Sequence, residues 1–257
     1  MKPAVNDLYK QNTLLAIPSP ADLDLLLPAL RPFAAKPNAV LYIPGQHVQT
    51  VYFPCGPAVA SFMVSVNGSE EERAVETMLV GREGAVGGIV SQGRLPAYSR
   101  MTVQSGGQFL TLPVPSLDQA KLASRNLENL FARYADCVMA QVFQATACNA
   151  THPIEKRAAK WILAAAERSG TDEVQLTQDR LSAMLGVGRS YVSRIIQALK
   201  ADGTLTVRRG RIFIHDVERL RQRSCSCNDR VRDHFDLVLN GVYPEPDSGS
   251  QLRFERQ

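Results

Sequence analysis

Residues 176–196 read LTQDRLSAMLGVGRSYVSRII, and this stretch decides the fold of the C-terminal half of the chain. Apolar residues recur at helical spacing on both sides of Gly186. Thr177 is a good helix N-cap, and Gly186 can adopt the left-handed conformation that ends a helix and redirects the chain. The stretch therefore predicts two helices joined by a tight turn. The expected inward face of the second helix consists of Val192, Ile195 and Leu199.

The outward face of the second helix carries hydroxyls and guanidinium groups and no acidic residue. Guanidinium groups can hydrogen-bond guanine edges in the major groove or grip phosphates. Any helical hairpin with solvated arginines is the alternative interpretation. The small Ser182, the glycine turn, the apolar plug Val187 and the acid-free face together favour a DNA-reading helix. The side chains expected to read bases are Arg189, Ser190, Tyr191 and Arg194.

A basic hairpin follows the second helix. Leu205–Val207 and Arg211–Ile214 alternate as strands around Arg208-Arg209-Gly210, which predicts a β-wing beside the groove. Residues 152–223 carry 14 Lys/Arg against 8 Asp/Glu, while residues 1–151 are balanced and residues 224–257 are net negative. The charge distribution thus indicates a polyanion partner for this segment. The side chains expected to contact phosphates are Thr177, Ser193, Arg208, Arg209 and Arg211.

The N-terminal part, residues 13–115, is rich in glycine, proline and β-forming residues. Short apolar runs alternate with turn signals such as Pro44-Gly45 and Gly106-Gly107, which is typical of a sandwich or barrel-like roll. A short helix is expected near residues 21–30. The expected strands cover residues 40–43, 48–53, 59–66, 76–80 and 109–112.

A long helix is expected over residues 116–149, which contain neither glycine nor proline. One apolar stripe runs along it, and it can pack on the chain's own β-roll or form a seam between two identical subunits. We favour the dimer seam. Pro153 breaks the helix, so residues 152–223 form a separate winged-helix domain and residues 224–257 a partly disordered extension. The stripe consists of Leu127, Phe131, Tyr134, Val138 and Val142.

The cysteines and histidines predict neither a metal site nor a catalytic site. Cys225 and Cys227 lack a second ligand pair at typical zinc spacing, and Cys55, Cys137 and Cys148 are expected to be buried hydrophobes. The histidines at 47, 152, 215 and 234 are scattered, and the sequence has no phosphate-binding loop, so no enzyme and no cofactor are expected. The sequence has no apolar run long enough to span a membrane and no secretory signal pattern, so we expect a cytoplasmic protein.

These motifs together resemble the Crp/Fnr family of bacterial transcription regulators. The resemblance rests on residues 176–196, on the wing at 209–212 and on residues 216–220, and extends loosely over residues 13–223. It implies an α+β fold: an N-terminal β-roll like a cyclic-nucleotide-binding jelly roll, a long dimerisation helix and a C-terminal winged helix-turn-helix. It also implies a homodimer that reads a palindromic operator in double-stranded DNA, with RNA polymerase as a further partner. Arg189 and Arg194 match the family's two arginine readers, and Thr177 matches its phosphate-contacting threonine.

The sequence departs from this family at several positions. Ser190 stands where the family often has glutamate, so the family's best-known operator should not be assumed. The turn at residues 84–87 has alanine in place of the ribose-binding glutamate, and residues 95–100 lack the phosphate-binding Arg-Ser pair. No four-cysteine iron–sulfur pattern precedes Cys55. We therefore expect an effector other than cyclic AMP, or none. The alternative function is a small-molecule sensor that acts mainly through protein contacts and binds DNA weakly. The residues expected to line an effector pocket are Gly84, Ala85, Gly87, Tyr98 and Arg100.

Overall fold

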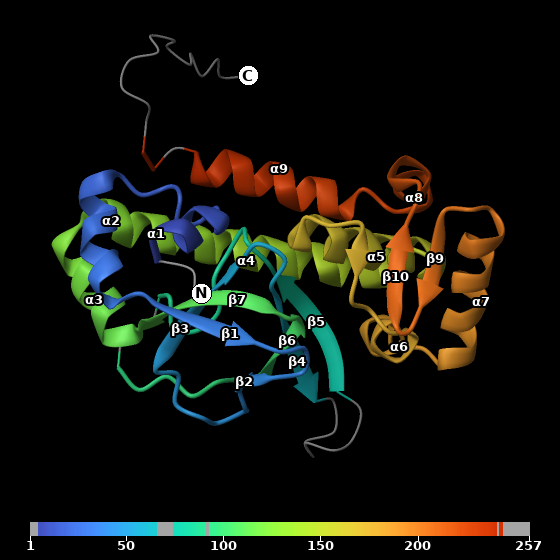
Figure 1. Cartoon of the computed structure of the whole chain (residues 1–257), viewed down its shortest axis with the longest axis horizontal. Helices are drawn as coiled ribbons and strands as arrows, with labels where there is room; N and C mark the ends of the chain where they lie inside the picture. The colour runs from blue at the N-terminus through green and yellow to red at the C-terminus, as the bar shows by residue number, and fades with distance from the viewer. Residues whose placement is uncertain (1–4, 66–73, 91–92, 241, 244–257) are drawn as a thin grey trace, which may run out of the picture.

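The computed structural model of the chain describes residues 5–65, 74–90, 93–240 and 242–243 (Figure 1). A β-roll and a winged-helix domain lie side by side, and a long helix runs behind the roll from one end of the molecule toward the winged-helix domain. Short helices precede the roll. They are α1 (Val5–Leu8), η1 (Tyr9–Gln11), α2 (Pro20–Leu26) and η2 (Leu27–Ala29).

Two antiparallel sheets form the roll, with strand orders β1-β7-β3 and β2-β6-β4-β5. Their facing side chains make a core that includes Ala60, Val103 and Phe109. The five expected strands are confirmed within a few residues, but β1 and β6 were missed. The strands are β1 (Arg31–Ala35), β2 (Val40–Tyr42), β3 (Thr50–Cys55), β4 (Val59–Ser65), β5 (Ala74–Val80), β6 (Arg100–Ser105) and β7 (Gly107–Pro113).

The expected single helix over residues 116–149 is two helices, α3 (Val114–Ala123) and α4 (Arg125–Thr151). Ser124 has extended backbone angles, and its hydroxyl accepts a hydrogen bond from the Leu127 N–H at 3.3 Å, so it caps α4. The prediction of one continuous helix was wrong, because serine starts a helix as an N-cap more readily than it continues one. Helix α4 packs on the β1-β7-β3 sheet through a large shared core.

The winged-helix domain begins with α5 (Ile154–Ser169), and its second and third helices are those predicted from residues 176–196. A three-stranded sheet of order β8-β10-β9 forms the wing, and its strand β8 was missed. The remaining elements are β8 (Glu173–Val174), α6 (Gln178–Leu185), α7 (Arg189–Ala201), β9 (Leu205–Arg208), β10 (Arg211–Ile214) and α8 (Val217–Arg223).

The C-terminal extension returns to the roll. Helix α9 (Cys227–Leu239) lies along α4, on the side away from the β-strands in Figure 1. Phe235 stacks edge-to-face on Tyr134 with ring centroids 6.2 Å apart, and Leu239 joins the same core. Helix α9 is therefore part of the main core. The expected disordered stretch at residues 244–250 lies outside the described residues. Within the described residues, no helix is long and apolar enough to cross a membrane.

Candidate nucleic-acid interface

Local capping and turn chemistry position the two helices of the candidate interface. The Thr177 hydroxyl accepts a hydrogen bond from the Arg180 N–H at 3.2 Å and so caps α6. Gly186 ends α6 with a φ of 70°, in the left-handed region that glycine adopts without strain. Helix α7 then starts at Arg189, so the turn from Gly186 aims the start of α7 away from the domain core.

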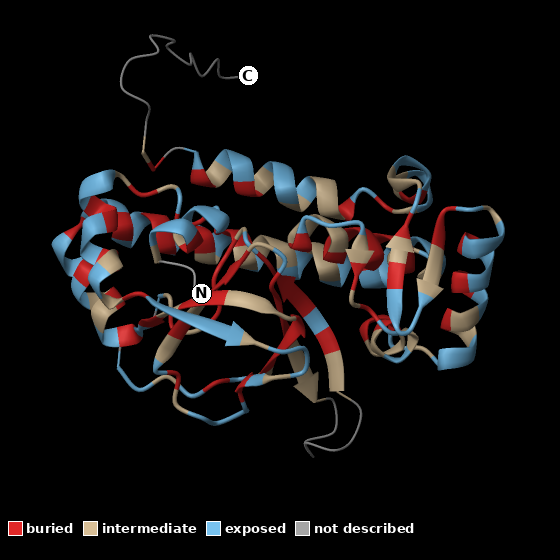
Figure 2. Ribbon diagram, viewed as in Figure 1, coloured by how far each residue is buried: buried red, intermediate tan, exposed pale blue. Residues whose placement is uncertain are grey.

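Helix α7 has one buried and one outward face, and Figure 2 shows it at the edge of the molecule with exposed residues on its outer side. The predicted inward face is confirmed, with Ile196 in addition to the three expected residues. The outward face consists of Arg189, Ser190 and Arg194, which are exposed, and Tyr191 and Ser193, which are partly buried.

One carboxylate from outside α7 meets its N-terminal end. Arg189 Nε lies 3.3 Å from Asp179 Oδ1, and about two-thirds of each side chain is exposed (69% and 67%). Such an exposed pair contributes about 0–1 kcal/mol. A phosphate or a guanine edge can therefore replace the Asp179 carboxylate at little energetic cost, and the pair holds the guanidinium near the N-terminal end of α7.

Tyr191 is held by a neighbouring helix. Its hydroxyl donates a hydrogen bond of 2.6 Å to Glu155 Oε1, which raises the pKa of Tyr191 and lowers the pKa of Glu155. The Arg194 guanidinium lies over the Tyr191 ring, 4.9 Å from its centroid. The tyrosine hydroxyl expected to read a base is thus engaged within the domain, and its ring supports Arg194.

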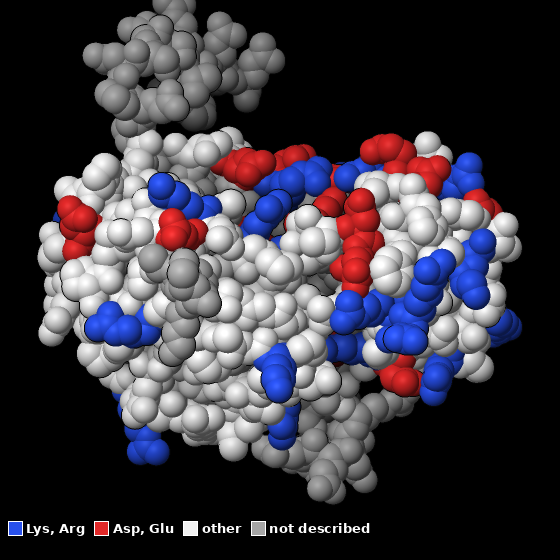
Figure 3. All heavy atoms as spheres, in the orientation of Figure 1, with Lys and Arg blue, Asp and Glu red and all other residues white. Residues whose placement is uncertain are grey.

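The wing carries the predicted basic tip. Arg209 and Gly210 have positive φ angles of 48° and 76° at the turn, and Arg208, Arg209 and Arg211 are exposed. Arg211 forms an ion pair with Glu173 of β8, so part of its charge is already balanced. Figure 3 shows Lys and Arg side chains gathered over the winged-helix part on this face of the molecule.

Helix α6 also docks on the β-roll through Arg180, a residue for which sequence reasoning predicted no role. Its Nε lies 3.3 Å from Oε2 of Glu76, which is fully buried on β5. Its Nη2 donates to Ser61 Oγ and Thr102 Oγ1, each at 3.2 Å. Burial raises the pKa of Glu76, and Arg180 opposes that rise. A buried ion pair therefore joins the sheet β2-β6-β4-β5 to the helix that precedes α7.

The predicted dimer seam is only partly available to a second subunit. Leu127, Phe131 and Tyr134 are fully buried between the roll and α9, so their assignment to a dimer interface was wrong. This part of the stripe packs on the chain's own core, which agrees with the alternative expectation that the long helix packs on the β-roll of the same chain. Val138 is partly buried against the same core, whereas Val142 is 48% exposed. The exposed apolar side chains of α4 include Met139, Val142 and Phe143.

The structure places the five residues expected to line an effector pocket in different surroundings, from the buried Ala85 to the exposed Tyr98. The hydroxyl of Tyr134 fills the space beside the 84–87 turn: it accepts a hydrogen bond from the Ala85 N–H at 2.9 Å and donates one to the Ala85 carbonyl at 3.0 Å. A Cβ at Gly84 would lie 2.1 Å from that hydroxyl oxygen. Tyr98 is 85% exposed, on the surface, and Arg100 is partly buried at the start of β6.

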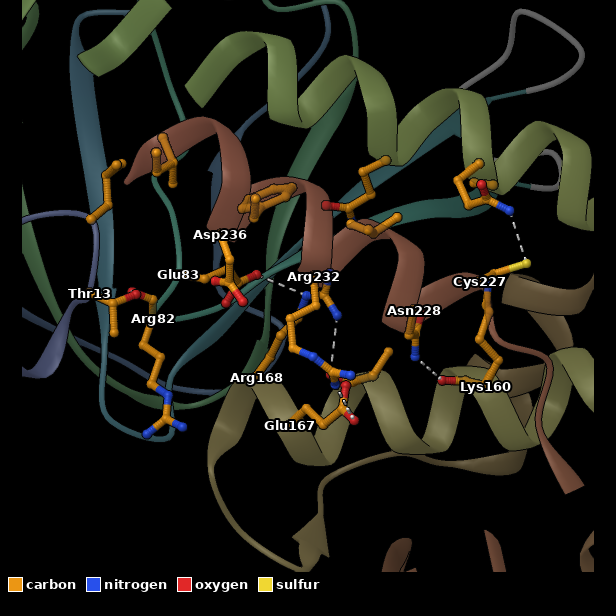
Figure 4. A pocket seen from close by; sticks show the side chains of 18 of the residues that line it. Thr13, Arg82, Glu83, Lys160, Glu167, Arg168, Cys227, Asn228, Arg232 and Asp236 are labelled. Carbon is orange, nitrogen blue, oxygen red and sulfur yellow. Dashed lines mark hydrogen bonds and ion pairs between the residues drawn. The ribbon is translucent and has the colours of Figure 1, made fainter. Parts of the chain in front are cut away.

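A cavity of about 500 Å³ lies elsewhere, between α4, α5, α9 and the roll's residues 82–83 (Figure 4). Polar side chains around it pair with one another: Arg168 Nε lies 2.9 Å from Glu83 Oε1, and Arg232 Nη1 lies 3.5 Å from Glu167 Oε1. The volume is in the range of small-molecule sites. Sequence reasoning missed the cavity, because α9 forms one of its walls and lies in residues 224–257, which were expected to be a partly disordered extension.

Sequence reasoning also missed a group of cysteines and a histidine. The structure brings Cys148 and His152, at the end of α4, to Cys225 and Cys227, beside the start of α9. The expected burial of Cys55, Cys137 and Cys148 is confirmed. The spacing of Cys148 and His152, one helical turn apart on one face, was the available signal.

An exposed helix behind a glycine turn, flanked by a basic wing, defines a winged helix-turn-helix domain. Comparison with protein families matches residues 156–223 to the Crp-like helix-turn-helix domain. The chain thus carries a Crp-like helix-turn-helix domain within the fold of the Crp/Fnr transcription regulators. A search of curated proteins gave no match.

Solved structures share the fold at low sequence identity. FixK2 from Bradyrhizobium japonicum is 16% identical with a TM-score of 0.58, over 76% of this chain and 98% of that one. The c-di-GMP-responsive regulator CLP from Xanthomonas campestris is 13% identical with a TM-score of 0.60, over 76% and 99%. TTHB099, a CRP-family transcriptional regulator from Thermus thermophilus, is 16% identical with a TM-score of 0.60, over 76% and 96%. Part of this chain therefore has no counterpart in these three structures.

Proposed function

We propose that this chain is a sequence-specific DNA-binding transcription regulator that binds a palindromic operator as a homodimer. The observation that carries the proposal is the outward face of α7, which presents Arg189, Ser190 and Arg194 from a Crp-like domain. In a helix-turn-helix, the N-terminal part of the second helix contacts base edges in the major groove. Arg189 and Arg194 are the proposed base readers.

Contacts with the DNA backbone would set the position of α7 in the groove. Thr177 is the N-cap of α6 and Ser193 lies near the start of α7, and the wing tip brings further guanidinium groups to one side. Phosphate contacts of this kind make binding fall steeply with salt concentration. The proposed phosphate-contacting side chains are Thr177, Ser193, Arg208, Arg209 and Arg211.

The homodimer is proposed to form along the exposed face of α4. Phe143 is 69% exposed, and Met139 and Val142 are about half exposed beside it (50% and 48%). Burying this apolar strip against its copy removes it from water, and each apolar side chain that becomes buried contributes about 1.5–3 kcal/mol. Replacing Phe143 with glutamate should shift the dimer to monomer in analytical ultracentrifugation.

Leu237 on α9 supplies the matched control for the dimer test. It is 78% exposed and lies on another helix, so Leu237→Glu should leave the dimer intact. If Phe143→Glu remains dimeric at the concentrations where the unmodified chain dimerises, the interface lies elsewhere.

Fluorescence anisotropy with genomic duplex fragments tests the DNA-binding proposal. Replacing Arg189 with alanine should reduce the preference for the bound operator over random DNA by about 1–3 kcal/mol, because a base contact is lost. Arg230→Ala, an exposed arginine on α9, is the control that removes the same charge far from α7. An unchanged preference in Arg189→Ala would refute the assignment of α7 as the reading helix.

A second candidate function is small-molecule sensing, and the cavity beside α9 favours it. The effector is proposed to differ from cyclic AMP, since the 84–87 turn has no carboxylate for a ribose and is closed by Tyr134. A thermal-shift screen with metabolites, run beside the DNA titration, separates the two functions. Ligand-dependent stabilisation without any preferred duplex would favour a sensor that acts through protein contacts, RNA polymerase included.

A further inference from the structure

Four metal-ligating side chains meet where α4 ends and the chain passes into the winged-helix domain. Cys148 and His152 come from the last turn of α4, and Cys225 and Cys227 come from the segment between α8 and α9. Their ligand atoms all lie within 4.8 Å of one another, and the three cysteines are buried while His152 is partly buried. Residues more than 70 positions apart in the sequence thus converge on one point.

The spacing of the ligand atoms matches the edges of a zinc tetrahedron. The Sγ atoms of Cys148 and Cys225 are 3.6 Å apart, and Cys227 Sγ lies 3.6 Å from Nδ1 of His152. With Zn–S bonds of about 2.3 Å and Zn–N bonds of about 2.0–2.1 Å, tetrahedral edges measure about 3.8 Å between sulfurs and about 3.5 Å between sulfur and nitrogen. Three thiolates and one imidazole are also a common ligand set of structural zinc.

A buried lysine beside the cluster gives an independent argument for a zinc site. The complex of one Zn²⁺ ion with three thiolates is negatively charged, and a buried ammonium group would balance that charge. Lys160 is only 5% exposed, and among the described residues no carboxylate forms an ion pair with it. A buried ammonium group needs a compensating charge. Three thiolates around one Zn²⁺ leave a net charge of −1, which Lys160 would neutralise.

Cys227 also has an outer hydrogen-bond partner of the kind that orients metal ligands, and a further hydrogen bond lies beside the cluster. Gln144 Nε2 donates a hydrogen bond to Cys227 Sγ at 3.2 Å, and Asn228 Nδ2 donates one to the Lys160 carbonyl at 3.0 Å. Cys227, Asn228 and Lys160 lie together at one end of the cavity in Figure 4. Hydrogen bonds to a thiolate sulfur stabilise its negative charge and fix its direction.

We propose that Cys148, His152, Cys225 and Cys227 bind one Zn²⁺ ion in a closed, four-coordinate site. With all four positions filled by the protein, the ion is structural and not catalytic. It ties the start of α9 to the end of α4, at the point where α4 gives way to the winged-helix domain. The site thereby fixes both the C-terminal extension and the hinge beside it.

Cysteine binds Zn²⁺ as the thiolate, so zinc binding must release the thiol protons. A disulfide between Cys148 and Cys225 is the competing use of these sulfurs. It would leave Cys227, His152 and the buried charge of Lys160 without a role.

Metal analysis of the full chain, purified under reducing conditions and without chelators, tests the proposal. We expect about one zinc ion per chain by mass spectrometry of metals, in line with one four-ligand site. Cobalt substitution should give the visible d–d absorption of a tetrahedral thiolate complex. Both measurements are made without DNA, so their failure would leave the proposed function untouched, and a failed operator titration would leave the zinc site untouched.

Variants identify the ligands. Cys227→Ser and His152→Ala should each abolish retention of zinc after dialysis against a competing chelator, whereas Cys137→Ala, a buried cysteine outside the cluster, should retain it. Gln144→Ala keeps all four ligands and should weaken zinc affinity by about 10–100-fold. This variant tests the site even if a ligand variant fails to fold.

Three results would overturn the proposal. They are a fully reduced chain that binds no zinc when it is supplied at one equivalent, zinc retention unchanged in both ligand variants, and a Cys148–Cys225 disulfide in metal-free, DNA-competent protein.

Discussion

Replacing Arg180 with methionine should lower the free energy of unfolding by about 3 kcal/mol, at the low end of what loss of one partner costs a buried ion pair. The change leaves the Glu76 carboxyl, which is 0% exposed, without its cation, and the Arg180 side chain is itself only 15% exposed. Removing one partner of a buried ion pair costs about 3–5 kcal/mol. The lower end applies because burial already raises the pKa of Glu76, so the orphaned carboxyl takes up a proton instead of remaining charged.

The double variant provides the sharper measurement. Replacing both Glu76 and Arg180 with methionine should bring stability back to within about 1 kcal/mol of the unmodified chain, because an apolar pair needs no desolvation of charge. The hydroxyls of Ser61 and Thr102 lose the guanidinium but keep each other, at an Oγ–Oγ1 distance of 3.0 Å. A double-mutant cycle should therefore give a coupling energy above about 2 kcal/mol.

Thermal and urea unfolding, followed by circular dichroism, measure these differences. For a chain of this size, about 3 kcal/mol corresponds to a fall in Tm of about 6–12 °C. The exposed Arg230 serves as the control, and Arg230→Met should change the unfolding free energy by less than about 0.5 kcal/mol. Two results would show that the ion pair does not hold the winged-helix domain on the roll. Arg180→Met would lose no more unfolding free energy than this control, or the losses of the Arg180 and Glu76 single variants would simply add in the double variant.

Two further predictions concern buried polar groups. Tyr134→Phe should lower the free energy of unfolding by about 2–3 kcal/mol, because the buried N–H and carbonyl of Ala85 lose their side-chain partner. A smaller loss in urea unfolding would mean that these two groups find other partners. The second concerns pH: the pKa of Glu76 is raised in the folded chain, so its contribution to stability is present below the ordinary value of 4.5 and is lost as the pH rises through the raised pKa. Glu76→Gln should remove this component, and an unchanged slope of stability against pH between the two proteins would contradict the assignment.

Much of the candidate interface could be predicted from sequence because it depends on neighbouring residues. The cap at Thr177, the left-handed Gly186 and the 3.6-residue period of α7 all act within a few positions, and each is found where expected. The wing turn at Arg209-Gly210 follows the same logic, since its positive φ angles are a local requirement. The confirmed strands of the roll likewise lie between local turn signals.

The apolar stripe of α4 shows what periodicity leaves open. A stripe containing Leu127, Phe131 and Tyr134 reveals that one face must be buried but not against which surface. The answer came from α9, which covers α4 from a segment far along the chain, as in the stacking of Phe235 on Tyr134. With that face occupied, the apolar side chains of α4 that remain exposed lie around Phe143.

By itself the sequence determined a winged helix-turn-helix, the outward face of its second helix and a preceding β-roll, because propensity, capping and periodicity act over short stretches of chain. Only the tertiary structure decided how the parts meet: Arg180 with Glu76, and Cys148 and His152 with the Cys225–Cys227 pair. These partners are separated by 104 positions in the first case and by 77 and 75 in the second. No local pattern encodes such pairs, because they form only when the packing of the whole core brings distant segments to one place.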